Sequence, residues 1–167
     1  RLAWPDFDCD GVYERFLPEF SLQCADDGVE PTGSREMASR CGVEMGTARY
    51  YRTLSRMTDD PVLSALTRHI ADDEVSHYKH FYRYLKKYQA REGQRRVGIA
   101  RALWNRLMMI DGADSRIAMG HIYRAQHPGR PFDERLYRDL RRASRPLIQQ
   151  HFPHRMCVQM LLKPLGL

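Results

Sequence analysis

The sequence predicts an all-α protein, an antiparallel four-helix bundle preceded by an irregular N-terminal extension. Apolar residues recur at helical spacing through four long segments, and clusters of glycine, proline and aspartate fall between these segments. The length of 167 residues matches one domain with a sizeable core. We therefore expect residues 1–34 to form an extension that packs on the bundle, and residues 35–167 to form the bundle itself.

The first half of the chain predicts one short helix and two long helices. In the extension, Asp10 to Gln23 can form a short helix that is broken near Pro18. Ser34 is typical of a helix N-cap, and the first long helix should then extend to about residue 57. Asp60 and Pro61 supply the cap and the first turn of the second long helix, which should end near residue 88.

The second half predicts two further long helices after a polar break at residues 89–96. The third helix should span about residues 97–125, with a weak point at Gly112. Asp133 is a predicted cap for the fourth helix, which should reach about residue 162. Two prolines inside that segment, Pro146 and Pro153, should kink or break it.

Glu74 and His77 form a Glu-x-x-His pair within the second long helix. Residues three apart lie on the same side of a helix, so this carboxylate and imidazole can bind one metal ion together. Both fall on an apolar stripe, where an unpaired carboxylate is costly to bury. A metal ion or a buried cation would relieve that cost, although isolated pairs of this kind are commonly solvated. The stripe consists of Leu63, Leu66, Ile70, Glu74, His77, Phe81 and Tyr84.

Glu44 is the single charged residue on the inner stripe of the first long helix. The connection at residues 58–61 is short, which forces the two helices to lie antiparallel. Glu44 precedes the middle of this connection by about as many residues as Glu74 follows it. The two carboxylates should therefore lie at the same height and, with His77, form one cluster.

A second half-site is predicted in the other pair of helices. Asp111 and Asp114 fall on the inner stripe of the third helix, and either can be rotated outward. His151 and His154 lie three residues apart on the apolar side of the fourth helix. Counted from the turn near Gly129, Asp111 and His151 are roughly level, so these residues can form a second ligand set.

The motifs in residues 35–88 resemble those of the ferritin-like superfamily, in particular its rubrerythrin-like and desaturase-like members. The residues that carry the resemblance are Glu44-Met-Gly-Thr-Ala-Arg-Tyr-Tyr51 followed by Asp72-Asp-Glu-Val-Ser-His77. Such bundles hold two irons between a Glu and a Glu-x-x-His from each hairpin. This chain has no second Glu-x-x-His, so a single iron, a different metal pair or an empty second site all stay open.

The resemblance implies a non-haem iron oxidase or oxygenase, with one or two irons or with manganese. The substrate would be a small or acyl molecule, oxidised with O2 or a peroxide in an apolar channel. Asp73 or Asp111 would orient His77, and Tyr51 would act as a hydrogen-bond donor or redox relay unless it is simply core. No Cys-x-x-Cys is present, so electrons would come from a separate donor protein. The alternative is a ferritin-like scaffold whose degenerate site no longer binds metal and which serves as an interaction module.

Charge is unevenly distributed along the chain. Residues 1–90 carry 12 Lys+Arg against 15 Asp+Glu, whereas residues 91–167 carry 15 against 6. The basic half suggests an acidic donor or carrier protein. We expect the arginines at 135, 138, 141, 142 and 145 to wrap around their helix without forming one stripe, and no aromatic residues are interleaved with them for base stacking. A solvated surface is therefore favoured over a nucleic-acid partner.

Composition sets the remaining expectations. No apolar run reaches the length of a membrane span, which predicts no membrane partner. Cysteine spacing predicts no zinc knuckle, and we expect reduced thiols in a cytoplasmic protein, with Cys41 and Cys157 in the core. Aromatic and methionine residues are numerous enough for a homodimer face, but nothing in the sequence locates one.

Overall fold

The computed structural model describes residues 6–21, 29–109 and 113–167, except for the side chains of residues 109, 113 and 114. This part of the chain is all-helical and contains no strand, so the predicted all-α class is confirmed. The helices in chain order are α1 (Cys9–Ser21), α2 (Gly33–Met57), α3 (Pro61–Glu92), α4 (Arg96–Met109), α5 (Ala113–Gln126), α6 (Glu134–His151) and α7 (His154–Leu162), followed by the short 3-10 helix η2 (Lys163–Leu165).

The described helices belong to two compact units. One contains α1, α5 and most of α6, and the other contains α2, α3, α4, α7 and the last turn of α6. This division does not follow the expected boundary after residue 34, because α1 contacts α5, which lies far along the chain. The prediction that residues 1–34 pack on a bundle stays a prediction.

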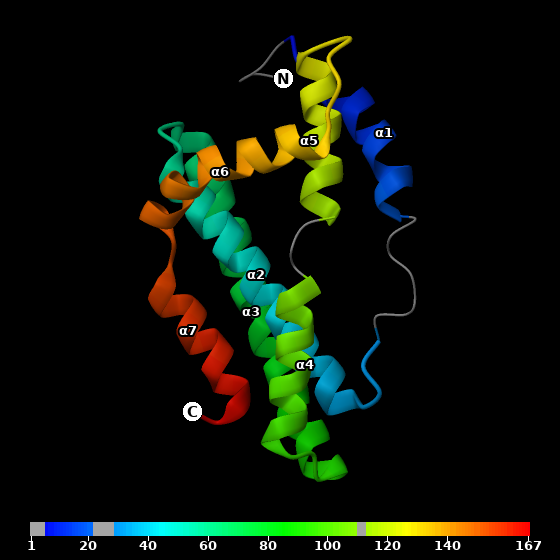
Figure 1. The fold of residues 1–167 in the computed structure, drawn as a ribbon. Coiled ribbons are helices and arrows are strands. Elements are labelled where there is room, and N and C mark those ends of the chain that lie inside the picture. Colours follow the sequence, from blue (N-terminus) through cyan, green and yellow to red (C-terminus); the bar gives the residue numbers. More distant parts are fainter. Residues whose placement is uncertain (1–5, 22–28, 110–112) are drawn as a thin grey trace. The chain divides into compact units, whose positions relative to one another are not determined.

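The long helices α2 and α3 form an antiparallel hairpin, shown as the central cyan and green pair in Figure 1. Asp60 caps α3 as expected, since its Oδ1 accepts the amides of Val62 and Leu63 at 2.8 and 2.9 Å. Near this turn the hydroxyls of Ser55 and Ser64 each donate to the other residue's carbonyl, at 3.0 and 2.9 Å. These bonds fix the register of the hairpin.

The far end of the hairpin is closed by a carboxylate from α3. Glu92 accepts the amides of Gly33 and Ser34 at 3.0 Å, together with the Ser34 hydroxyl. The N-cap of α2 is Thr32 and not Ser34, whose hydroxyl is engaged by Glu92. The helix α3 is also longer than expected and ends at Gly93, which has a φ of 62° in the left-handed region that glycine tolerates.

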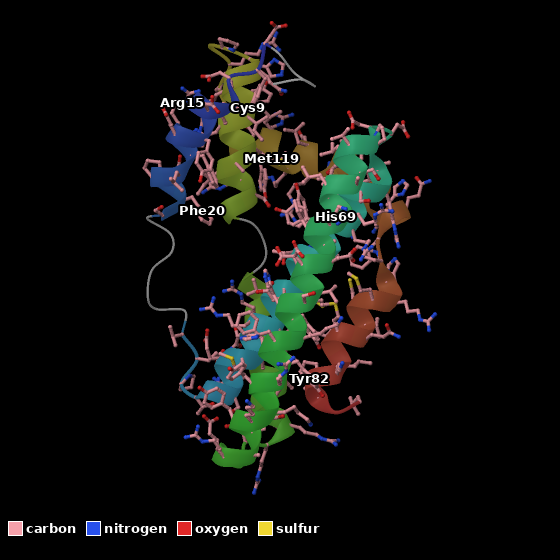
Figure 2. The ribbon with its side chains drawn as sticks, turned by 180° about the vertical axis from the view of Figure 1, so that it is seen from behind. Cys9, Arg15, Phe20, His69, Tyr82 and Met119 are labelled. Carbon is pink, nitrogen blue, oxygen red and sulfur yellow. The ribbon has the colours of Figure 1, made fainter. Side chains whose placement is uncertain are left out.

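The helices α4 and α7 both contact α2 (Figure 1), and η2, which follows α7, also contacts α4. Two apolar clusters hold them there, one centred on Cys41 and Met45 with α7 and the other on Leu85 and Ile99 with α4. On the α7 side, Lys163 Nζ lies 4.9 Å from the centre of the Tyr82 ring, which Figure 2 labels. The hairpin is thus packed by one helix from each of the later segments.

The two later long helices are each divided. The expected third helix is α4 and α5, and its expected weak point, Gly112, lies outside the described residues. The expected fourth helix is α6 and α7, which are separated at Phe152 and Pro153. The break at Pro153 is confirmed, whereas Pro146 lies inside α6 without ending it. As a consequence, residues 113–145 belong to the unit that contains α1.

In the other unit α1 packs on α5. Phe16 and Phe20, the latter labelled in Figure 2, stack with ring centres 5.2 Å apart, and the ring of Phe16 meets His121 edge-on. His121 Nε2 lies 2.8 Å from Glu19 Oε2. The short helix expected from residue 10 is confirmed as α1, but the break expected near Pro18 is wrong, because Pro18 lies inside the helix.

Candidate metal centre

The structure brings Glu44, Glu74 and His77 together between α2 and α3. His77 Nδ1 lies 3.2 Å from Oε2 of Glu74 and 3.7 Å from Oε2 of Glu44. Each residue offers one ligand atom, and these atoms all lie within 4.8 Å of one another. The register expected from the short connection is therefore confirmed by the position of the two carboxylates.

The cluster lies at the edge of the helix pair and not in the middle of its apolar face. The side chains of Glu44 and Glu74 are 13% and 18% exposed, whereas that of His77 is 61% exposed. The apolar stripe expected on α3 is wrong, because the buried face of the helix is shifted by about one residue from it. Leu66 and Tyr84, which belong to the expected stripe, are exposed like His77. The small residues Thr67 and Ala71 are buried instead, because they allow α2 and α3 to approach closely.

Burial and a neighbouring carboxyl make Glu44 hard to ionise. The pKa of Glu44 is raised from 4.5 to about 7, first by burial and then by the neighbouring carboxyl of Glu74, with which it shares a hydrogen bond. Two carboxylates in this position require either a proton between them or a positive charge beside them. A metal ion that binds here below about pH 7 would therefore displace a proton from Glu44.

Two positive groups act on the pair, and neither is a buried arginine. The pKa of Glu44 is lowered slightly by His77 and by Arg40. Arg40 is already bound to Glu36 through Nε at 2.8 Å and is exposed. The hydrogen bond to Glu74 raises the pKa of His77. In the described part of the chain, no buried arginine thus neutralises the carboxylate pair in place of a metal ion.

The donor set fits a divalent metal ion. Metal–ligand bonds of about 2.1 Å place neighbouring ligand atoms about 3.0 Å apart in an octahedral site and about 3.4 Å apart in a tetrahedral one. The distances of 3.2 and 3.7 Å from His77 Nδ1 are close to this range before any adjustment of side chains. Two carboxylates and one imidazole suit iron, manganese or zinc.

An ion pair beside the cluster was missed by the sequence analysis. Arg52 on α2 reaches Asp72 on α3, with Nη2 2.6 Å from Oδ1. Asp72 is not the residue directly opposite Arg52 in the antiparallel pair, so the contact depends on the long arginine side chain. Asp73, expected to orient His77, is exposed and contributes to its raised pKa only through charge.

Tyr51 lies two turns after Glu44 on α2 and is half-buried. Its ring meets that of Tyr50 edge-on, with centres 5.3 Å apart. Its suggested function as a donor or relay stays a prediction.

The second predicted ligand set is not assembled in the described part of the structure. His151 is the last residue of α6 and His154 the first of α7, so the one-face spacing that suggested a pair does not apply across the break. The carbonyl of His151 accepts from Arg56 Nη1 at 3.3 Å. Asp111 lies outside the described residues, as does the side chain of Asp114. Within the described part of the chain, Glu44, Glu74 and His77 are the one group of three such side chains close enough together to hold a metal ion.

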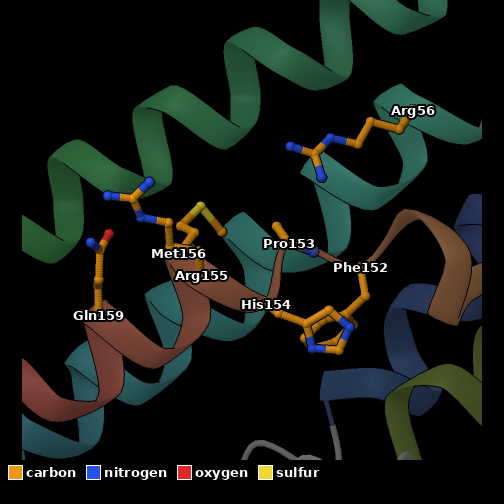
Figure 3. Close-up of a pocket in the computed structure, with 7 residues that line it drawn as sticks. All are labelled: Arg56, Phe152, Pro153, His154, Arg155, Met156 and Gln159. Atoms are coloured by element: carbon orange, nitrogen blue, oxygen red, sulfur yellow. The ribbon is translucent and has the colours of Figure 1, made fainter.

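His154 lines a cavity of about 370 Å³ at the start of α7. Its ring packs against Phe152, with centres 4.6 Å apart, as Figure 3 shows. A second cavity, of about 210 Å³, belongs to the unit of α1 and α5 and includes Arg116 and Arg124. Neither cavity is lined by the carboxylate cluster, so neither is the expected substrate channel. The first cavity is lined by Arg56, Phe152, Pro153, His154, Arg155, Met156 and Gln159.

The buried cysteines are not ligands of the cluster. Burial, with a smaller contribution from Glu44, raises the pKa of Cys41 to about 12. Burial likewise raises the pKa of Cys157, and both thiols are unpaired, which confirms their expected place in the core. A thiol with such a pKa stays protonated and is a poor metal ligand.

Comparisons with known proteins leave the centre to be judged on its geometry. No protein-family model, curated protein or solved structure matches the chain. None of the helices in the described ranges combines the length and the apolar character needed to cross a membrane.

Proposed function

We propose that the α2–α3 hairpin binds a metal ion, iron in the first place, and that the chain is a ferritin-like, metal-dependent oxidoreductase. The observation that supports this proposal most strongly is the pair of largely buried carboxylates, Glu44 and Glu74, facing one imidazole. The described residues provide ligands for one ion. A second ion would require further ligands, for which Asp111 and Asp114 are the candidates from the sequence.

Each residue of the cluster has a distinct part in this proposal. Glu44 and Glu74 supply the negative charge, and the proton they hold leaves when a cation arrives. His77 presents Nδ1 to the carboxylates. Because its side chain is largely exposed, the cluster is accessible from solvent beside it. Three protein ligands leave positions for a substrate or an oxidant, and iron bound there would supply the redox chemistry.

The proposed reaction is the oxidation of a small or acyl substrate with O2 or a peroxide. Electrons would come from a separate, acidic donor protein, for which the basic second half of the chain provides complementary charge. The competing proposal is a helical scaffold in which the shared proton permanently neutralises the carboxylate pair.

Oxygen consumption with ferrous iron separates an oxidase from a scaffold. The chain loaded with one equivalent of Fe(II) should consume O2 faster than free Fe(II) at the same concentration, and Glu44→Gln and Glu74→Gln should each remove this excess. Glu14→Gln is a matched control, because Glu14 is an exposed glutamate on α1. Consumption equal to that of free iron in the wild-type chain would contradict the oxidase. Fe(II) that stays unbound in the presence of the wild-type chain would favour the scaffold.

A further inference from the structure

Four arginines form a straight row on α6. Arg135, Arg138, Arg142 and Arg145 are spaced by three, four and three residues, and a helix turns about 100° per residue. They therefore fall within an arc of about 80° and extend about 15 Å along the axis. The arginines at 135, 138, 141, 142 and 145 were expected to wrap around their helix. For these four the expectation is wrong, because α6 is continuous through their positions and their spacing places them on one side. We call these four residues the arginine row.

The row is exposed and lacks acidic partners among the described residues. All four side chains are exposed, and none is in an ion pair within 4.0 Å. The helix has two acidic residues of its own. Glu134 is paired with Arg116 at 4.0 Å, and Asp139 lies about 40° outside the arc.

Like charges three and four residues apart make the row costly to the helix that carries it. The neighbours Arg135 and Arg138, Arg138 and Arg142, and Arg142 and Arg145 all repel one another, and such pairs destabilise a helix. No ion pair within 4.0 Å offsets this repulsion in the described part of the chain. An anionic partner that lies along the row would offset it.

The surroundings of the row favour phosphate over a protein surface. Protein interfaces are centred on buried apolar or aromatic residues, but the apolar residues of this segment lie on the other side of α6, where Tyr137 is buried and Leu136 and Leu140 are half-buried. Nucleic-acid interfaces are polar and strongly positive, and arginine binds phosphate in a bidentate manner. The row also contains no aromatic residue on which an unpaired base would stack, which favours a duplex over a single strand.

We propose that the arginine row binds the phosphate backbone of a double-stranded nucleic acid. Recognition would be independent of base sequence, because the row offers charge and hydrogen-bond donors in a line and no contact to base edges. This surface is independent of the cluster at Glu44, and the two proposals succeed or fail separately.

Salt dependence of duplex binding tests the proposal quantitatively. Four phosphate contacts predict a slope of log affinity against log salt of about −3.6, which is a loss of about 150-fold between 50 and 200 mM salt. Binding of the full chain to a fluorescent 20-base-pair duplex of mixed sequence measures this slope by anisotropy. The double variant Arg138→Gln/Arg142→Gln should halve the slope to about −1.8. The double variant Arg68→Gln/Lys86→Gln removes the same charge from exposed positions on α3 and should keep the wild-type slope.

Thermal unfolding excludes a trivial loss of structure, because removing the central like charges should leave the melting temperature unchanged or raise it. Equal losses in both double variants would overturn the proposal, since binding would then follow net charge and not the row. Tighter binding to the same strand unpaired, or to poly-glutamate of equal charge, would overturn it in favour of a single strand or an acidic protein.

Discussion

The Oε2 atom of Glu44, on α2, lies 3.7 Å from Nδ1 of His77, on α3. These residues meet because a three-residue connection at 58–60 sets two long helices side by side with a fixed register. Glu74 completes the group from one turn before His77. The chemistry proposed for the chain follows from the charge that these three residues place in a small, largely shielded space.

Metal affinity should rise with pH. The pKa of Glu44 is about 7, raised by burial and by Glu74, so a metal ion must displace a proton below that pH. His77, whose pKa is also raised, must likewise lose its proton to bind a metal ion. We therefore expect the dissociation constant for Mn(II) to fall by at least about tenfold per pH unit between pH 5 and 7, and to level off only once both groups have lost their protons. Competition titrations against a chromophoric chelator measure this dependence. Affinity that does not change with pH would show that the metal does not bind at the carboxylate pair.

The metal-free chain should be stabilised by Glu44→Gln at alkaline pH. Because the folded-state pKa exceeds the ordinary value of 4.5, the carboxyl contributes stability that is fully present below about pH 4.5 and is lost as the pH rises through about 7. A neutral glutamine avoids this loss. In the presence of a chelator, the variant should melt at a higher temperature than the wild type at pH 8 and at nearly the same temperature at pH 5. The opposite order at pH 8 would mean that Glu44 is ionised and neutralised without metal.

Tyr78→Phe should destabilise the packing of α7 on the hairpin. The buried Tyr78 hydroxyl donates to the carbonyl of Met160 at 2.6 Å. That carbonyl has no helical donor four residues later, because the residue there is Pro164, which lacks an N–H. Losing the bond leaves a buried acceptor unsatisfied, at a cost of about 1–3 kcal/mol in the free energy of unfolding. Urea denaturation measures the change, and Tyr82→Phe, which keeps a half-buried ring in the neighbouring stack, should cost less.

Glu92→Gln should weaken the closed end of the hairpin in a pH-dependent manner. Hydrogen bonds from Ser34 and Gly33 lower the pKa of Glu92, so its charge stabilises the fold above about pH 4.5, and this contribution is lost as the pH falls below that value. The variant should melt at a lower temperature than the wild type at pH 7, and the gap should narrow at pH 4. Glu14→Gln should show no such gap, and a gap that stays constant down to pH 4 would exclude the charge of Glu92 as its cause.

Local signals in the sequence were sufficient for the hairpin. Asp60 and Pro61 fix where α3 begins, and the short connection then places Glu44 opposite Glu74. The rotation of α3 was not predictable in the same way. Large apolar residues such as Leu66 indicate an inner face, but close contact with α2 is made by Thr67 and Ala71, which are small. A periodicity of large side chains therefore placed His77 deeper than it lies.

The later half of the chain was harder to predict because its breaks depend on tertiary packing. The apolar spacing continues through Phe152, although α6 ends and α7 begins around Pro153. Pro146 is equally strong as a local signal, yet it lies inside α6. The shared face of four arginines on α6 follows from helical spacing, but only because the helix is continuous through them.

Direct measurement of bound Mn(II) by electron paramagnetic resonance at pH 8 tests the central claim most simply. We expect one equivalent of bound Mn(II) per chain in the wild type and in Glu14→Gln, and a loss of affinity of more than about 100-fold in Glu74→Ala and in Glu44→Ala. Wild-type protein that leaves all Mn(II) free in solution, or ligand variants that bind as the wild type does, would contradict it.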